Sequence, residues 1–117
     1  MVDQIRLCPG DTQGALVDSC REKSMLPEAC SPLGVGAIFQ VPEMRELAAK
    51  NGRSIAQVCV RGSLRRDYLP LPKSVTLSRI QENLKVFDSA LLYEDAQLIA
   101  DLEGCVGYAQ DSDQTRF

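Results

Sequence analysis

The segment from Leu69 to Asn83 constrains the fold most, because it has the pattern of a short apolar strand followed by a cationic side chain at the start of a helix. Lys73 follows the apolar residues directly, and Ser74 and Thr76 are residue types that cap helix N-termini. Further polar residues recur at a spacing that places them on one helical face: Arg79, Glu82 and Asn83. A phosphate here would meet backbone N–H groups, a hydroxyl and two permanent cations within one turn. The segment therefore predicts an anion site.

A purely structural interpretation of the same residues is also open. In that interpretation Thr76 only caps the helix, and Lys73 and Arg79 are only solvated charges. Charged residues are common near helix ends because they interact with the helix dipole.

Residues beyond this segment extend the pattern. The run Leu71-Pro72-Lys73-Ser74 is followed by Arg79-Ile80-Gln81-Glu82-Asn83 and by Val86-Phe87-Asp88. Together these residues resemble the NADP(H)-binding signature of the aldo-keto reductases. Other blocks look like the same family, in the family's order: Val2 to Ile5, Ala29 to Gly34, Leu47 to Ala49 and Ile55 to Val58. The resemblance covers nearly the whole chain, to about Gly107.

The resemblance implies a fold and a cofactor. It matches only the C-terminal part of a reductase, beginning near the sixth strand of a (β/α)8 barrel. It therefore implies an α/β fold with about three strands and flanking helices, and NADP(H) as the cofactor. The residues that it implies for cofactor binding are Gln4, Ser31, Leu33, Lys73, Ser74, Val75, Arg79, Glu82 and Asn83.

The resemblance also bears on catalysis. Members of the family reduce a carbonyl by hydride transfer from NADPH, with a tyrosine as proton donor supported by an aspartate, a lysine and a histidine. All four belong to the part of the family sequence that has no counterpart here, and the chain contains no histidine. We therefore expect a fragment that retains an NADP(H)- or phosphate-binding segment and is not competent alone for carbonyl reduction.

Two other outcomes stay open. One is an independent small enzyme, for example an ester hydrolase, in which Ser31 or Cys30 is the nucleophile and Lys73, Glu28 or Asp3 is the base. The chain has no G-x-S-x-G motif to support this. The other is an inactive truncated product.

Two residues depart from the family pattern in ways that affect the site and the core. Cys30 stands where the family usually has an aromatic side chain that stacks on the nicotinamide, and Gly62 stands where it usually has a tryptophan. We expect a weaker nicotinamide site and a less well filled core.

Length and charge limit the domain count and the partners. The 117 residues are too few for a complete barrel, which needs about 250 residues. We expect one half-barrel domain over residues 1–107 and a flexible tail over residues 108–117. A formal net charge of −3 and the lack of a long apolar run argue against nucleic-acid and membrane partners. A small phosphorylated ligand is the partner that the anion site favours.

Three strands taken from a barrel leave two open sheet edges and an uncovered apolar face. We therefore predict a homo-oligomer, a dimer or higher, in which the copies complete a shared core. The alternative is a repacked, mainly α protein, because Pro27, Pro70 and Pro72 interrupt the expected strands.

The cysteines indicate a compartment rather than a metal site. Five cysteines form no C-x-x-C pair, and without histidine a mixed zinc site has too few ligands, so we expect no metal. Met1 leads straight into a strand pattern with no signal peptide, which favours the reducing cytoplasm.

The remaining periodicity predicts helices. Asp11 or Thr12 is expected to cap the first helix, whose apolar face contains Val17 and Cys20. Further helices are expected from Pro42 to Lys50, after Ser54, from Ser78 to Val86 and from Glu94 to Leu102. The strand candidates are Val2 to Leu7, Met25 to Cys30 and Tyr68 to Pro72.

Overall fold

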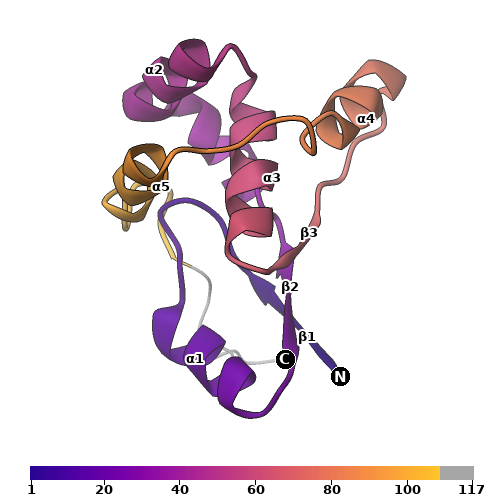
Figure 1. Cartoon of the computed structure of the whole chain (residues 1–117), viewed down its shortest axis with the longest axis vertical. Coiled ribbons are helices and arrows are strands. Elements are labelled where there is room, and N and C mark those ends of the chain that lie inside the picture. The colour runs from indigo at the N-terminus through magenta and orange to yellow at the C-terminus, as the bar shows by residue number, and fades with distance from the viewer. Residues whose placement is uncertain (109–117) are drawn as a thin grey trace.

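The computed structural model describes residues 1–108 and shows an α/β fold (Figure 1). Residues 109–117, which make up most of the predicted tail, lie outside the described residues. In chain order the elements are β1 (Val2–Arg6), α1 (Gly14–Glu22), β2 (Leu26–Cys30), the 3-10 helix η1 (Gly34–Gln40), α2 (Pro42–Asn51), α3 (Ile55–Arg65), β3 (Leu69–Leu71), α4 (Leu77–Leu84) and α5 (Tyr93–Ala100).

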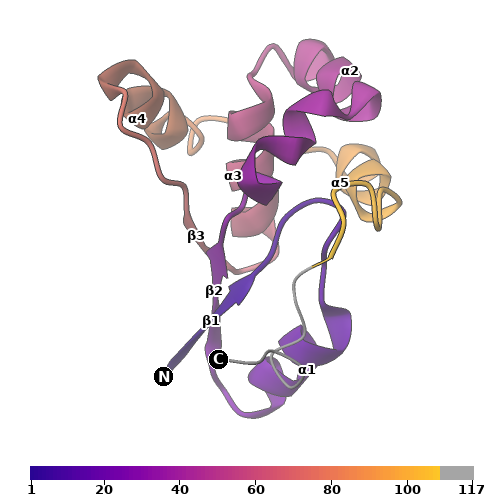
Figure 2. The ribbon, with the colours of Figure 1, turned by 180° about the vertical axis from the view of Figure 1, so that it is seen from behind.

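The three strands form one parallel sheet in the order β1-β2-β3, seen from opposite sides in Figures 1 and 2. Parallel neighbours need a crossover connection, and here α1 provides the first and α2 with α3 the second. This arrangement confirms the predicted α/β fold with about three strands and flanking helices. The alternative of a repacked, mainly α protein is wrong.

Pro27 lies in β2, the central strand, although proline normally interrupts a sheet. The Leu26 N–H donates to the Met1 carbonyl at 3.0 Å, on the β1 side. Successive N–H groups of a strand point to opposite sides, so the N–H that Pro27 lacks would point towards β3. Pairing with β3 begins only at Glu28, so no ladder hydrogen bond is lost at Pro27. At Pro27 the central strand is therefore paired on the β1 side only, as an edge strand would be.

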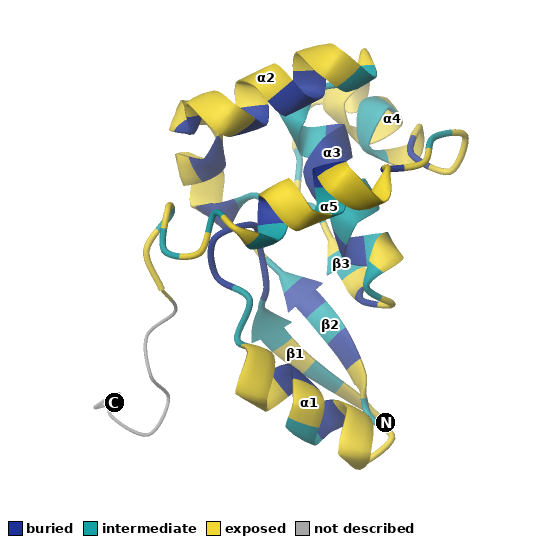
Figure 3. Ribbon diagram, turned by 60° about the vertical axis from the view of Figure 1, so that its left-hand side comes forward, coloured by how far each residue is buried: buried dark blue, intermediate teal, exposed yellow. Residues whose placement is uncertain are grey.

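The two faces of the sheet differ in burial (Figure 3). On one face Leu7 and Ala29 pack with Val17 of α1 and with Tyr68, and all four are buried. On the other face no described helix covers the apolar side chains, which are Val2, Leu26, Leu69 and Leu71 and are each 41% to 51% exposed. The strand register places these residues on one side, because Val2 pairs with Leu26, and Glu28 and Cys30 pair with Leu69 and Leu71.

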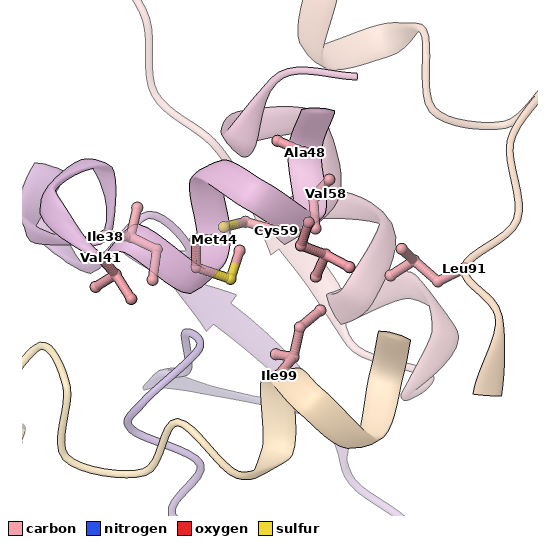
Figure 4. Packing of buried hydrophobic residues seen from close by; sticks show 9 residues of the cluster. Ile38, Val41, Met44, Ala48, Val58, Cys59, Leu91 and Ile99 are labelled. Atoms are coloured by element: carbon pink, nitrogen blue, oxygen red, sulfur yellow. The ribbon is translucent and has the colours of Figure 1, made fainter. Parts of the chain in front are cut away.

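A second core lies between α2, α3 and α5. Met44 of α2, Cys59 of α3 and Ile99 of α5 point into one space in Figure 4, and each is at most 7% exposed. The helix boundaries follow from the local sequence, because Pro42 occupies the first turn of α2 and Gly52 ends it in the left-handed conformation. None of the described helices is both long and apolar enough to cross a lipid bilayer.

The start of α1 differs from the prediction that Asp11 or Thr12 caps it. The N-cap is Gln13, with a φ of 42° and no side-chain capping bond. The Asp11 carboxylate instead lies 3.5 Å from the Arg6 guanidinium, and the Thr12 hydroxyl donates to Glu103 at 2.9 Å. Tertiary contacts therefore take up both side chains that could have capped the helix.

A buried carboxylate anchors α5 to α2. Asp95 is 2% exposed and accepts hydrogen bonds from the Lys50 ammonium at 2.6 Å and from the Asn51 amide at 3.1 Å. The Lys50 hydrogen bond, aided by Asn51, lowers the pKa of Asp95 below its ordinary value despite burial. The same hydrogen bond raises the pKa of Lys50. Both shifts show that the pair stabilises the folded state in its charged form.

We predict that Asp95→Asn flattens the acid side of the stability profile. A depressed pKa in the folded state contributes stability that is present above the ordinary carboxyl value of 3.8 and is lost as the pH falls through the folded-state pKa. The raised pKa of Lys50 contributes stability below its ordinary value of 10.5, and this is lost as the pH rises through the folded value. Urea unfolding at a series of pH values measures both limbs.

Asp101→Asn is the matched control, because Asp101 is an exposed carboxylate just after the same helix and accepts a hydrogen bond only from Gln97 among the bonds of the described residues. It should leave the pH profile of the free energy of unfolding close to that of the unmodified chain. Equal profiles for Asp95→Asn and the unmodified chain would show that the buried carboxylate does not anchor α5.

Candidate functional site

A groove of about 530 Å³ lies between the end of β3 and α4, with η1 and the start of α3 on its other side. Seven of the nine residues predicted for cofactor binding line it: Leu33, Lys73, Ser74, Val75, Arg79, Glu82 and Asn83. This volume falls within the range of small-molecule sites. The structure thus brings the predicted anion-binding segment together with part of the loop after β2.

The chain turns between β3 and α4 through a hydroxyl contact. The Ser74 hydroxyl oxygen accepts a hydrogen bond from the Thr76 N–H at 3.2 Å, which closes a short turn before α4. Thr76 occupies the N-cap position, as expected, but its side chain makes no capping hydrogen bond. The N–H groups of the first turn of α4 therefore lack a side-chain cap.

The charges in the groove favour an anion. Lys73 and Arg79 are exposed, and within the described residues neither forms an ion pair with a carboxylate. Glu82 and Asn83, which are half-buried, provide acceptors and an amide donor deeper in the groove. Two cations and one carboxylate give the groove a net positive charge.

Gln57 holds α4 in place, and the sequence analysis did not single it out. Its side chain completes a capping box with Ser54 at the start of α3. The same amide donates to the carbonyls of Glu82 and Lys85, at 3.1 and 3.2 Å, at the far end of α4. The Ser-x-x-Gln spacing was the signal for the cap, but the contact with α4 depends on tertiary structure.

Arg53 adds to this attachment. Its guanidinium donates to the Lys85 carbonyl at 3.2 Å and lies 3.3 Å from the Asp88 carboxylate. Since α4 itself buries none of its residues, these polar contacts and the buried Val86 just after the helix position the segment that carries Arg79.

Two predicted residues lie outside the groove lining. Gln4 is on the uncovered face of the sheet, where its amide donates to the Glu28 carboxylate at 2.6 Å. Ser31 follows β2 in the left-handed conformation, with a φ of 50°. The groove also contains residues that sequence reasoning missed, namely Phe39, Ser54 and Ala56. Phe39 had a weak signal, as an aromatic residue close to a turn-rich loop.

The side chains proposed for a hydrolase are not connected to a base. Within the described part of the chain, no hydrogen bond joins the Ser31 hydroxyl or the Cys30 thiol to Lys73, Glu28 or Asp3. Glu28 accepts from Gln4, and Asp3 accepts from the Cys20 thiol at 3.4 Å. Residues 1–108 contain no cluster of three or more acidic, cysteine or histidine side chains placed to hold a metal ion.

The sequence profile of the aldo/keto reductase family matches residues 4–103. The chain belongs to this family. This confirms the resemblance to the family that the sequence motifs indicated, and the Lys73 groove lies within the matched residues.

Curated relatives show how much of the family domain is present. The uncharacterized oxidoreductase YtbE of Bacillus subtilis is 32% identical over 117 residues, which is 100% of this chain and 42% of that protein. The glyoxal reductase of the same organism is 36% identical over 99 residues, which is 85% of this chain and 36% of that protein. The chain therefore spans about two fifths of the length of the relatives that it matches.

Solved structures also match this chain over part of their length. A variant of Gox0644 crystallised in complex with NADPH superposes with a TM-score of 0.93 and 31% identity, over 100% of this chain and 44% of that one. The aldo-keto reductase MGS-M4, from a deep-sea metagenome library, superposes with a TM-score of 0.91 and 27% identity over the same share. The three-stranded fold is thus part of an aldo/keto reductase barrel.

Proposed function

We propose that this chain is the cofactor-binding portion of an aldo/keto reductase and that its Lys73 groove binds NADP(H). The observation that carries the proposal is the groove itself, where two cations without ion-pair partners among residues 1–108 flank a helix start that has no side-chain cap. The NADPH present in a structural neighbour that covers the whole chain supports this choice of ligand.

We propose that particular residues of the groove contact particular parts of the cofactor. The 2′-phosphate is dianionic, so it takes the site between Lys73, Arg79 and the N–H groups at the start of α4. Glu82 carries a negative charge and therefore pairs with hydroxyl or amino groups of the adenosine rather than with phosphate. Phe39, which is 38% exposed, offers an aromatic face at the opposite wall.

Carbonyl reduction needs groups beyond these 117 residues. The family mechanism uses a tyrosine, an aspartate, a lysine and a histidine, and this sequence has no histidine. We propose that the chain acting alone binds the cofactor without turning over an aldehyde. Among residues 1–108 no hydrogen bond links Ser31 or Cys30 to a candidate base, which gives no support to the alternative of an ester hydrolase.

We also propose that the uncovered face of the sheet is buried by a second copy of the chain. Val2, Leu26, Leu69 and Leu71 form an apolar patch on this face, and both outer strands have an open edge within the described residues. A contiguous apolar sheet face is a usual site of association.

We propose the reducing cytoplasm as the location of this protein, which fits its five free thiols.

We predict that the chain binds NADPH more tightly than NADH and that Arg79→Ala removes most of this preference. A charge-assisted hydrogen bond to phosphate contributes about 1.5–3 kcal/mol, which corresponds to roughly tenfold to a hundredfold in Kd. Isothermal titration calorimetry with both cofactors measures the effect.

Lys23→Ala is the control, because it removes an exposed cation just after α1 that is not part of the groove. It should leave both Kd values unchanged. Equal binding of NADPH and NADH by the unmodified chain, or no binding of either, would contradict the proposed 2′-phosphate site.

We predict that the chain self-associates and that its Tm rises with protein concentration, because folding is linked to association. Light scattering at micromolar concentration should report a dimer or a higher oligomer. Leu69→Lys should shift the chain towards monomer, because it places a charge in the apolar patch of the sheet. Leu98→Lys, at a side chain of similar exposure on α5, should not. A monomeric unmodified chain whose Tm is independent of concentration would contradict the proposal.

A further inference from the structure

Gly62 lies inside α3 at a half-buried position where a side chain is missing. A Cβ built on Gly62 would meet no atom closer than Leu91 Cδ1 at 3.8 Å and Ile99 Cδ1 at 3.9 Å, which are ordinary contact distances. A glycine inside a helix costs about 1 kcal/mol relative to alanine. Neither a special backbone conformation nor crowding requires glycine at this position.

A cavity of about 210 Å³ opens beside this glycine. It lies between α3, α5 and the residues that follow β1, so it separates the two buried cores of the protein. The apolar side chains and small groups that line it come from both cores and from α5: Leu7, Cys59, Tyr68, Ala96, Ile99 and Ala100.

Four of the polar side chains around the cavity have hydrogen-bond partners in the protein, and Arg66 lies in the wall as well. The Ser63 hydroxyl donates to the Cys59 carbonyl at 3.2 Å, and the Arg65 guanidinium donates to the Leu91 carbonyl at 2.9 Å. The Thr12 hydroxyl donates to Glu103 at 2.9 Å, and the Gln97 amide donates to Asp101 at 3.2 Å. A ligand in this cavity therefore finds mainly apolar surface, with these four polar side chains already engaged.

The cysteines in the wall act as apolar groups. Cys8 and Cys59 are buried, and burial raises the pKa of both thiols, so both stay neutral at physiological pH. The rings of Tyr68 and Tyr93 also line the cavity, and Tyr93 is 74% exposed. Exposure of this ring places solvent beside the cavity, which allows a small molecule to enter.

We propose that the cavity beside Gly62 is a binding site for an uncharged aromatic molecule of one or two rings. A dry cavity of about 150 Å³ lined by aliphatic and aromatic side chains is large enough to hold benzene. The larger volume here extends the range to bicyclic molecules such as indole. The site shares no lining residue with the Lys73 groove, so the two sites can be tested separately.

Indole is a suitable probe, and amide chemical shifts followed by NMR locate its binding. We expect saturable shifts at Leu7, Gly62 and Ile99, together with a higher Tm. Gly62→Ala adds a methyl group that the contacts above accommodate, so it should keep indole binding and raise the Tm of the unliganded chain. Gly62→Trp should occupy the cavity with its own indole ring and abolish binding.

The chain has no tryptophan, so the emission of Gly62→Trp reports directly on burial of the new ring. A blue-shifted emission maximum supports a cavity of the proposed size, and Leu98→Trp, at an exposed position of α5, is the solvent-exposed reference. Ala96→Leu fills the cavity from the opposite wall, and it should also abolish indole binding if Gly62→Trp does not fold.

Three results would overturn the proposal. The first is the absence of saturable shifts in the unmodified chain. The second is shifts confined to the uncovered sheet face around Leu26 and Leu69. The third is indole binding that both Gly62→Trp and Ala96→Leu leave intact.

Discussion

Parallel pairing of β1, β2 and β3 is the constraint on which the rest of the structure depends. Parallel strands cannot be joined by tight turns, so each connection must cross one face of the sheet and bring a helix with it. The same pairing aligns the carboxyl ends of all three strands at one edge. For this reason the residues after β2 and after β3, which are far apart in the sequence, contribute Leu33 and Lys73 to one groove.

The sequence predicted the strands and most of the groove because those signals are local. The apolar run before Lys73, the spacing of Arg79, Glu82 and Asn83, and the caps of α2 and α3 each act over a few residues. Pro27 seemed to argue against a central strand, but the short length of β3 leaves its position unpaired on that side. The length of a neighbouring strand cannot be inferred from the sequence of β2 itself.

The rest of the site depends on contacts between distant residues. Thr12 reaches Glu103, and Asp11 lies beside Arg6, so neither side chain caps α1 as a local pattern predicts. Gln57 reaches the end of α4, and Phe39 faces the same groove as Lys73. The position of Gly62 against Leu91 and Ile99 likewise depends on the packing of α3 on α5. No sequence motif predicts this packing. Such contacts are properties of the folded chain as a whole.

The attachment of α4 has a kinetic consequence. This helix buries none of its residues and is held by the side chains of Gln57 in α3 and of Arg53 just before α3. A helix with little buried apolar surface opens at a low free-energy cost compared with global unfolding. A ligand held against Arg79 would be able to leave when α4 opens, and its own contacts with α4 would make that opening rarer. The residence time of that ligand would then depend on the hydrogen bonds that hold α4 as well as on the ligand's own contacts, and substitutions at Gln57 would raise the dissociation rate without touching the ligand.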